Sequence, residues 1–181
     1  MEDATGMENE FSITKTQYQK NTFFNNKQIA EKIVGSLNPE KRKELESSAQ
    51  KICALREQLC ELYKNIFARI CSGCSGKCCS GSIVPPEQEM LVRLVLSDEP
   101  EFPNHDTNYR TPHSDTTPCV FLSKNGCALR HWRPIVCLRY KCTDLKDAMD
   151  KETNNQVDEI FKQIDNEMVE FHRLAYSSSR W

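Results

Sequence analysis

The chain has 181 residues, a formal net charge of −2 and a hydrophobic content of 38%. This length suits one domain with appendages, and the near-neutral charge gives no general attraction to nucleic acid or to an anionic membrane. No run of about 18 apolar residues is present, so we expect no membrane-spanning helix. The acidic start MEDATGMENEFS shows no secretory signal, and we therefore expect a cytoplasmic protein with reduced cysteines.

The first seventy residues read as two helices of different length. Residues 1–37 form a polar segment in which 1–25 are expected to be poorly ordered and a short helix covers about 26–35. Asn38-Pro39 is a strong helix start, with asparagine as the cap and proline at the first helical position. We expect a long helical arm over 38–70. Its apolar stripe recurs at spacings of three and four, at Ile52, Leu55, Leu59, Leu62, Ile66 and Ile70.

Two cysteines, Cys53 and Cys60, lie within this expected helix, each one step from the stripe. We interpret them as small, half-buried apolar residues. A dimer disulfide or a role as additional metal ligands is the alternative, but no partner motif lies nearby. They are therefore not among our candidate site residues.

The first cysteine run, CSGCSGKCC, follows the long helix directly. Pro85-Pro86 then opens a second helix, with Met90, Leu91, Leu94 and Val95 facing inward. The next 22 residues hold four prolines and almost no aliphatic side chains, which is typical of a disordered loop or a functional flap. The loop also contains His105, Asp106, His113 and Asp115, which we interpret as solvated polar residues rather than a metal or catalytic site.

The second cysteine run lies in PCVFLSKNGCALRHWRPIVCLRYKC. Asn125-Gly126 predicts a small β-hairpin with a two-residue turn, because both residues accept positive φ. After Cys142, the stretch TDLKDAMDK predicts a short helix that leads through Asn154-Asn155 to a terminal helix. The apolar residues of that helix repeat at three and four, so one face should be buried. They are Val157, Ile160, Phe161, Ile164, Met168, Phe171 and Ala175, and His172 lies beside them.

Eight of the ten cysteines fall within these two runs, and they are our candidate metal ligands: Cys71, Cys74, Cys78, Cys79, Cys119, Cys127, Cys137 and Cys142. Clustered cysteines bind metal or form disulfides, and a reducing cytosol favours metal. Structural disulfides and redox-active thiols remain as alternatives. Four of the six glycines lie among these cysteines, where they allow tight turns around sulfur.

Basic residues surround the second run, at Lys124, Arg130, Arg133, Arg139, Lys141 and Lys146, against the single acid Asp144. Four thiolates on a divalent metal leave about two negative charges. We therefore interpret the basic residues as charge compensation around sulfur. A surface for phosphate or nucleic acid is the alternative, although aromatic residues that could stack on bases are limited to Trp132 and Tyr140.

The spacing leaves the choice of metal open between zinc and an iron–sulfur cluster, including a four-iron cluster. Only one Cys-x2-Cys pair is present, whereas two zinc knuckles would show two. Adjacent Cys78 and Cys79 point in different directions, which indicates a polynuclear centre or two neighbouring sites. If Asn125-Gly126 forms the turn, Cys119 and Cys127 lie on the order of 10–16 Å apart. We therefore predict that these two cysteines do not bind the same mononuclear ion.

The sequence CSGCSGKCC, followed by PCVFLSKNGC and RPIVCLRY, resembles the CxxCxxCC cysteine-cluster family of zinc- or iron-chelating proteins over about residues 71–142. By this resemblance, seven of the candidate cysteines match family positions, and Arg133-Pro134 matches the family's Arg-Pro pair. Cys142 matches none. Three residues separate Cys74 from Cys78 where the family name implies two, and Arg130 stands where the family often has tyrosine.

The resemblance implies metal binding and no defined activity. One branch of the family resembles flagellin lysine methylases, but the chain has no Gly-rich strand–turn–helix segment for a nucleotide-like methyl donor. Three hypotheses follow, of which we favour a non-enzymatic metal-binding protein with a structural or redox centre and a protein partner. The others are an enzyme that uses an iron–sulfur centre in group transfer, and a zinc-stabilised module for nucleic acid or protein.

The expected fold class is mainly α: a helical domain with a small β-hairpin, organised around a cysteine-rich metal site. We divide the chain into the N-terminal segment 1–37, the helical arm 38–70, a cysteine-cluster domain at 71–142, and a C-terminal helical region at 143–181 that packs on it. The oligomeric state does not follow from the sequence.

Overall fold

The computed structural model describes residues 15–70, 83–102, 119–123, 126–140 and 142–177. Its helices and strands are, in chain order, α1 (Lys15–Ser36), α2 (Pro39–Ile70), α3 (Glu87–Val95), β1 (Leu122–Ser123), β2 (Gly126–Cys127), the short 3₁₀ helix η2 (Arg130–Trp132), α4 (Ile135–Arg139), α5 (Thr143–Ala148) and α6 (Lys151–Tyr176). The fold is mainly helical, which confirms the expected class.

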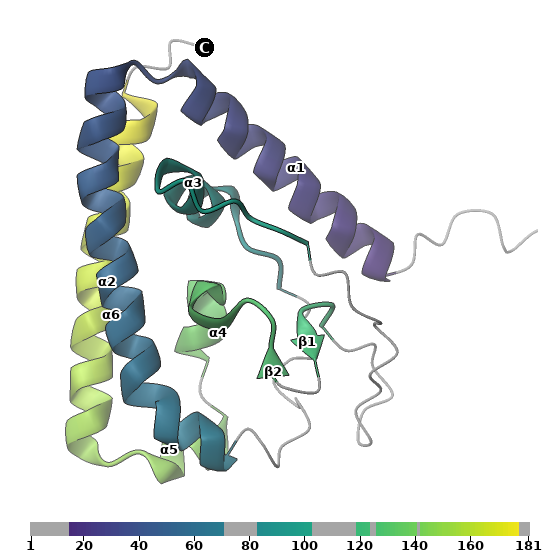
Figure 1. Cartoon of the computed structure of the whole chain (residues 1–181). Coiled ribbons are helices and arrows are strands. Elements are labelled where there is room, and N and C mark those ends of the chain that lie inside the picture. The colour runs from purple at the N-terminus through teal and green to yellow at the C-terminus, as the bar shows by residue number, and fades with distance from the viewer. Residues whose placement is uncertain (1–14, 71–82, 103–118, 124–125, 141, 178–181) are drawn as a thin grey trace, which may run out of the picture.

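Two long helices, α2 and α6, run side by side in opposite directions and form the spine of the molecule (Figure 1). Helix α1 leaves the start of α2 at an angle, and α3 packs against both of them. Helix α4 and the strands lie in the angle between α1 and α2, while α5 lies at the base, where α2 ends and α6 begins. The second cysteine run is therefore placed on the inner side of the spine.

Helix α1 begins at Lys15, so the expectation that residues 1–25 are poorly ordered is wrong for 15–25, and the helix is longer than the predicted 26–35. Tertiary contacts explain the difference, because burial of one helix face outweighs a weak local propensity. Phe23 is fully buried and its ring lies within 5.4 Å of Phe102 and 6.0 Å of Phe121, measured between ring centroids. The Asn26 side chain also donates a hydrogen bond to the Pro85 carbonyl at 3.0 Å.

Helix α2 has the predicted limits and the predicted cap. The Asn38 side-chain oxygen accepts a hydrogen bond from the Lys41 N–H at 2.8 Å, which satisfies one of the free N–H groups at the helix start. Its buried face is rotated from the expected stripe, however. Leu55, Leu62 and Ile66 are only partly buried, and the fully buried positions are Leu45, Ala49, Ile52, Arg56, Leu59 and Tyr63. A charged residue thus lies in the centre of the buried face.

The apolar residues form two clusters along the spine. The first cluster joins α1, α3, the start of α2 and the end of α6, and it includes Phe23, Met90, Phe121 and Phe171. The second cluster joins the last turns of α2 to α4, α5 and the first half of α6, and it includes Tyr63, Leu138, Leu145 and Phe161. The predicted inward-facing residues of α3 and most of those of α6 lie in these clusters.

The expected β-hairpin is not supported as an element of the fold. Within the described ranges, strand pairing consists of two residue pairs, Leu122 with Cys127 and Ser123 with Gly126. Gly126 therefore lies in the ladder, and positions 124–125, outside the described residues, separate the strands, whereas we expected the turn at Asn125-Gly126. A ladder this short contributes little on its own, so the helices position this segment.

Helix α6 also begins earlier than expected and includes Asn154 and Asn155. The Asp150 side chain caps it by accepting a hydrogen bond from the Thr153 N–H at 2.7 Å. His172 does not share the buried face, because it is exposed and stacks loosely on Tyr176 with ring centroids 4.3 Å apart. In the part of the chain that the structure describes, no helix combines the length and the apolarity that a bilayer crossing requires.

Candidate metal centre

The eight candidate ligands divide into two groups. Cys71, Cys74, Cys78 and Cys79 lie outside the described residues, although the helix before them ends at Ile70 as predicted. The other four are described and each is partly buried: Cys119, Cys127, Cys137 and Cys142. Among the described residues alone, no three Cys, His, Asp or Glu side chains converge as a metal site. The loop residues His105, Asp106, His113 and Asp115 also lie outside the described ranges.

Cys119 and Cys127 belong to the same side of the molecule, where both pack against the first apolar cluster. The strand ladder pairs Cys127 with Leu122, and the Ala128 N–H donates to the Phe121 carbonyl at 2.8 Å. Residues 120–121 form a turn, so the chain from Cys119 to Leu122 is not an extended strand. Our prediction that the two sulfurs bind different centres assumed extended strands and a turn at Asn125-Gly126, and it stays a prediction.

Cys137 and Cys142 lie on the two short helices. Cys137 is in α4, where its N–H donates to the Pro134 carbonyl at 2.8 Å. Cys142 occupies the position before α5 and packs against the second apolar cluster, which also contacts Ile66 and Phe67 from the end of α2. Cys142 therefore shares an apolar cluster with the helix end from which the first cysteine run continues.

A buried ion pair fixes the segment between these cysteines to the helical scaffold. Arg56 on α2 and Glu89 on α3 form a 2.9 Å salt bridge, and their side chains are only 1% and 8% exposed. Burial raises the pKa of the Glu89 carboxyl above its ordinary value, although the Arg56 charge and the Ile135 N–H act in the opposite direction. A buried pair of this kind is stable only when further hydrogen bonds satisfy both groups.

Those further hydrogen bonds all go to the main chain of residues 131–135. Arg56 Nε donates to the His131 carbonyl at 3.2 Å, and a terminal nitrogen donates to the Arg133 carbonyl. The second oxygen of Glu89 accepts from the Ile135 N–H at 3.0 Å, at the first residue of α4. Sequence reasoning did not identify this pair. The available signal was Arg56 itself, four residues after Ile52 and three before Leu59 in an otherwise apolar row.

Trp132 completes the anchoring of this segment. Its ring is buried at 8% exposure between two guanidinium groups, with the central carbon of Arg56 5.2 Å and that of Arg93 5.3 Å from the ring centroid. Arg93 is held in turn by Asp98 through two hydrogen bonds of 3.0 and 3.1 Å. Cations at these distances from an indole face are attracted by its quadrupole.

Two of the predicted basic residues contact the scaffold, Arg133 partly buried and Arg139 on the surface. The Arg133 guanidinium lies 4.9 Å from the centroid of Phe67, and its buried Nε has no hydrogen-bond partner among the described residues. Arg139 lies 4.8 Å from the centroid of Phe161 and pairs with Asp165 at 2.8 Å. Lys124 and Lys141 lie outside the described residues, as does the Arg130 side chain.

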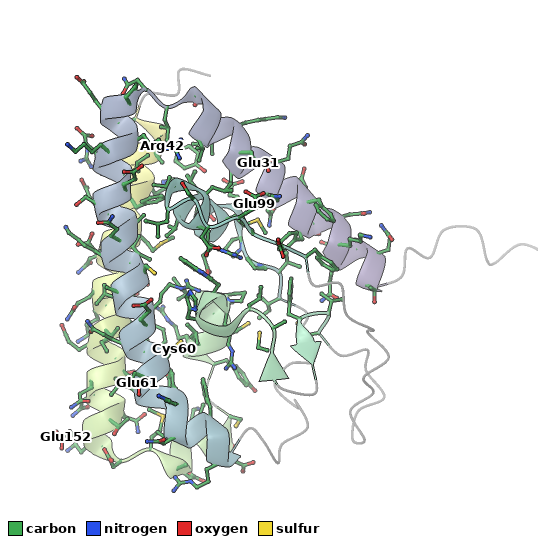
Figure 2. The ribbon with its side chains drawn as sticks, viewed as in Figure 1. Glu31, Arg42, Cys60, Glu61, Glu99 and Glu152 are labelled. Carbon is green, nitrogen blue, oxygen red and sulfur yellow. The ribbon has the colours of Figure 1, made fainter. Side chains whose placement is uncertain are left out.

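The helical cysteines Cys53 and Cys60 are both half-buried free thiols (Figure 2 labels Cys60). Burial is the main cause that raises the pKa of each thiol above its ordinary value, although the Arg133 and Arg56 charges act against this at Cys60. The neutral thiol is therefore favoured at neutral pH. Their half-buried positions fit our interpretation of them as small apolar residues, and that neither binds metal stays a prediction.

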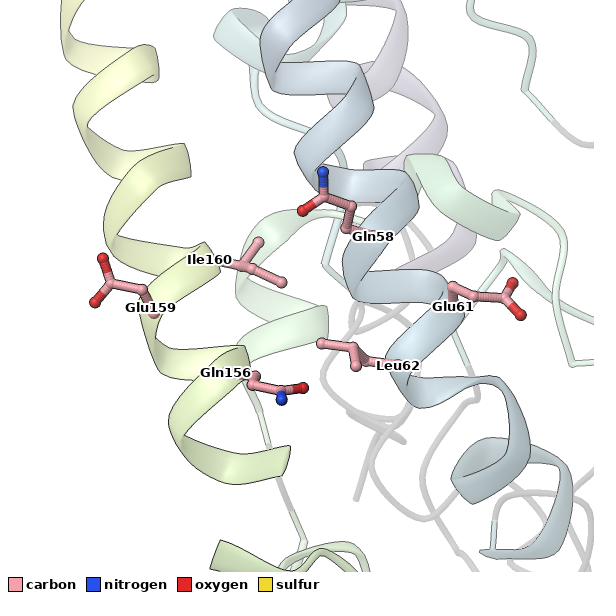
Figure 3. A pocket seen from close by; sticks show the side chains of 6 residues that line it. All are labelled: Gln58, Glu61, Leu62, Gln156, Glu159 and Ile160. Carbon is pink, nitrogen blue, oxygen red and sulfur yellow. The ribbon is translucent and has the colours of Figure 1, made fainter. Parts of the chain in front are cut away.

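An open groove lies on the opposite side of the spine from the cysteines, between α2 and α6 (Figure 3). Leu62 and Ile160 point toward each other across it, whereas Glu61 and Glu159 point away. Each of these carboxylates pairs with a lysine on its own helix, at 3.0 Å for Glu61 and 3.3 Å for Glu159. The groove offers neither a net charge nor a sulfur ligand, so we do not include it in the metal site.

Comparison with known proteins gives one match. The sequence model of the CxxCxxCC family, described as "Putative zinc- or iron-chelating domain", matches residues 70–162, which is more than half of the chain. The match extends beyond the expected 71–142, so it includes Cys142 and continues into α6. No curated protein and no solved structure matches the chain. On the strength of this match and of the cysteines it spans, the chain belongs to the CxxCxxCC family of zinc- or iron-chelating domains.

Proposed function

We propose that this protein binds metal through the cysteines of both runs, as an iron–sulfur cluster or as zinc, in a structural or redox role. The observation that carries the proposal is the position of the second run. Cys142 packs on the same cluster as Ile66 and Phe67, and Phe67 is four residues before Cys71 in the sequence. Cys142 of the second run thus packs on the same apolar cluster as the end of the helix that leads into the first run.

The donor set suits zinc or iron, because both are bound by several thiolates. Cys119 and Cys127 pack on one apolar cluster and Cys142 on the other. This difference supports a polynuclear centre or two neighbouring sites over one mononuclear ion. An iron–sulfur cluster would supply electron transfer, whereas zinc would supply only structural crosslinking or a charge.

The surroundings of Arg133 argue against a nucleic-acid surface, because its guanidinium packs on Phe67 and is less available to phosphates than the sequence suggested. Arg139 contacts Phe161 and pairs with Asp165, but its side chain is 47% exposed. We therefore propose that the basic residues stabilise the scaffold and the thiolate charge. We also propose a reducing, cytoplasmic compartment and a protein partner for a redox role. The enzymatic alternative, group transfer at an iron–sulfur centre, receives no specific support from the described residues.

The test is elemental analysis together with visible absorption of anaerobically purified protein. We expect iron with broad visible absorption, or zinc without colour. Cys71→Ser and Cys137→Ser should each lower the metal content, since each removes one proposed ligand. Cys53→Ser and Cys60→Ser are the matched controls, because they change the same atom in the same chain and should leave the metal content unchanged. Equal metal content in all five proteins would refute the proposal.

A further inference from the structure

The buried pair of Arg56 and Glu89 is hydrogen-bonded to the main chain of the segment that carries Cys137. Between them, these two side chains bond three main-chain groups of residues 131–135, and they bond each other. Both side chains come from the helices, and the bonded groups all belong to the segment that leads into α4. The segment that carries Cys137 therefore has its position set by α2 and α3.

The two oxygens of Glu89 have separate partners. One pairs with Arg56, and the other accepts from the Ile135 N–H, which is one of the free N–H groups at the start of α4. A carboxylate at a helix start is also favoured by the partial positive charge there. Because α4 contains only five residues, this contact at its first residue lies close to every part of the helix. Cys137 lies in its first turn, two residues after the contact.

Arg56 holds the preceding residues in the same way. Its guanidinium bonds the His131 and Arg133 carbonyls and lies over the Trp132 ring, so three consecutive residues are fixed by one side chain. A planar guanidinium can bond two carbonyls and a carboxylate at once, which a lysine ammonium cannot do with the same geometry. Arg56 lies before residue 70 and is therefore outside the part of the chain that the family shares.

We infer that Arg56 and Glu89 are positioning residues for the metal centre, and that they set how tightly the metal is retained through the orientation of Cys137. This inference rests on the proposed function, since it requires Cys137 to be a ligand. Groups that orient ligands of a metal typically change its affinity by about 10–100-fold when they are removed. The loss of Arg56 would leave the His131 and Arg133 carbonyls unbonded and Glu89 buried without its cation.

The experiment compares the rate of metal release to a chelator among folded variants of the full chain. Arg56→Met should release metal about 10–100-fold faster than the wild type. Arg56→Lys should release it at an intermediate rate, because an ammonium keeps the charge but cannot bond two carbonyls and a carboxylate with the same geometry. Leu45→Ala is the matched control. It removes a fully buried side chain from the same helix, roughly three turns away, so it lowers stability without removing any hydrogen bond to residues 131–135.

Hydrogen exchange of the metal-free proteins provides a second measurement that does not depend on metal. Arg56→Met should accelerate exchange of the Ile135, Cys137 and Leu138 amides, whereas Leu45→Ala should not do so selectively. Equal metal release from Arg56→Met and Leu45→Ala, or exchange in this segment that matches the wild type, would overturn the inference. A wild type that contains no metal would instead refute the proposed function, and the positioning role with it.

Discussion

Two tyrosines, one buried and one half-buried, provide the sharpest test of the packing, because the same substitution should change stability in opposite directions. Tyr63 on α2 is fully buried, stacks on Phe67 with ring centroids 4.6 Å apart, and has no hydrogen-bond partner for its hydroxyl within the described part of the chain. Tyr176 at the end of α6 is half-buried, and its hydroxyl donates to a Glu87 carboxylate oxygen at 2.8 Å. Removing the hydroxyl therefore removes a penalty at one site and a bond at the other.

The magnitudes follow from the cost of burying a polar group. A buried hydroxyl without a partner costs about 1–3 kcal/mol, and a typical hydrogen bond contributes about 0.5–1.5 kcal/mol. Tyr63→Phe leaves the stacked ring in place, so we expect the free energy of unfolding to rise by about 1–2 kcal/mol. Tyr176→Phe should lower it by about 1 kcal/mol. For a chain of this length, each kcal/mol shifts the melting temperature by about 2–4 °C.

Urea titration followed by circular dichroism measures both changes at neutral pH, with the metal content of the three proteins matched. Each variant serves as the control for the other, since the chemical change is identical. A loss of stability of about 1 kcal/mol or more in Tyr63→Phe would show that its hydroxyl has a partner that the described contacts omit, and the reasoning from an unsatisfied group would be wrong.

Three further predictions concern pH, capping and the spine. Burial raises the pKa of Tyr63 from 10 to about 12, and burial together with the Glu87 bond does the same for Tyr176. Because these phenols ionise first in the unfolded chain, they should lower the free energy of unfolding as pH rises from 10 to 12. Urea midpoints across this range should fall less in Tyr63→Phe than in the wild type. Asn38→Ala should lower the free energy of unfolding by about 1 kcal/mol, because it removes the cap of α2. Asn38→Ser keeps a capping side chain and should retain most of that stability. Equal urea midpoints for the wild type and both variants would show that the cap contributes nothing. Phe161→Ala should lower the free energy of unfolding by about 3–5 kcal/mol in the same assay. Val169→Ala, at an exposed position of the same helix, should lower it by less than about 0.5 kcal/mol. Similar losses for both variants would contradict the assigned core.

Local signals predicted α2, α3 and α6 because each carries its own start signal or apolar repeat. Asn38-Pro39 and Pro85-Pro86 lie directly at helix starts, and their effect depends on neighbouring residues only. Helix α1 was missed over its first half because it is stabilised by distant partners. Phe23 contacts Phe102 and Phe121, and Asn26 reaches the Pro85 carbonyl. No local pattern in residues 15–25 contains that information.

The candidate site was likewise predictable only in part. The cysteines themselves, and the family they indicate, could be read from spacing. The residues that position the second run could not, because Arg56 and Glu89 are 33 positions apart and neither belongs to a cysteine motif. A charged residue within an apolar row shows that a buried partner is needed, but it does not show which one. The turn at Asn125-Gly126 was misplaced because the helices, rather than the turn residues, fix the register of so short a ladder.

The family match and the packed core of this protein have different limits. Residues 70–162 begin where α2 ends and stop in the middle of α6. A fragment cut at those limits would retain every candidate ligand but lose Arg56, Leu59 and Tyr63, so the second apolar cluster would face solvent on one side. Grafting the cysteine region onto another protein should therefore fail unless the recipient supplies a helix with an arginine at the matching place.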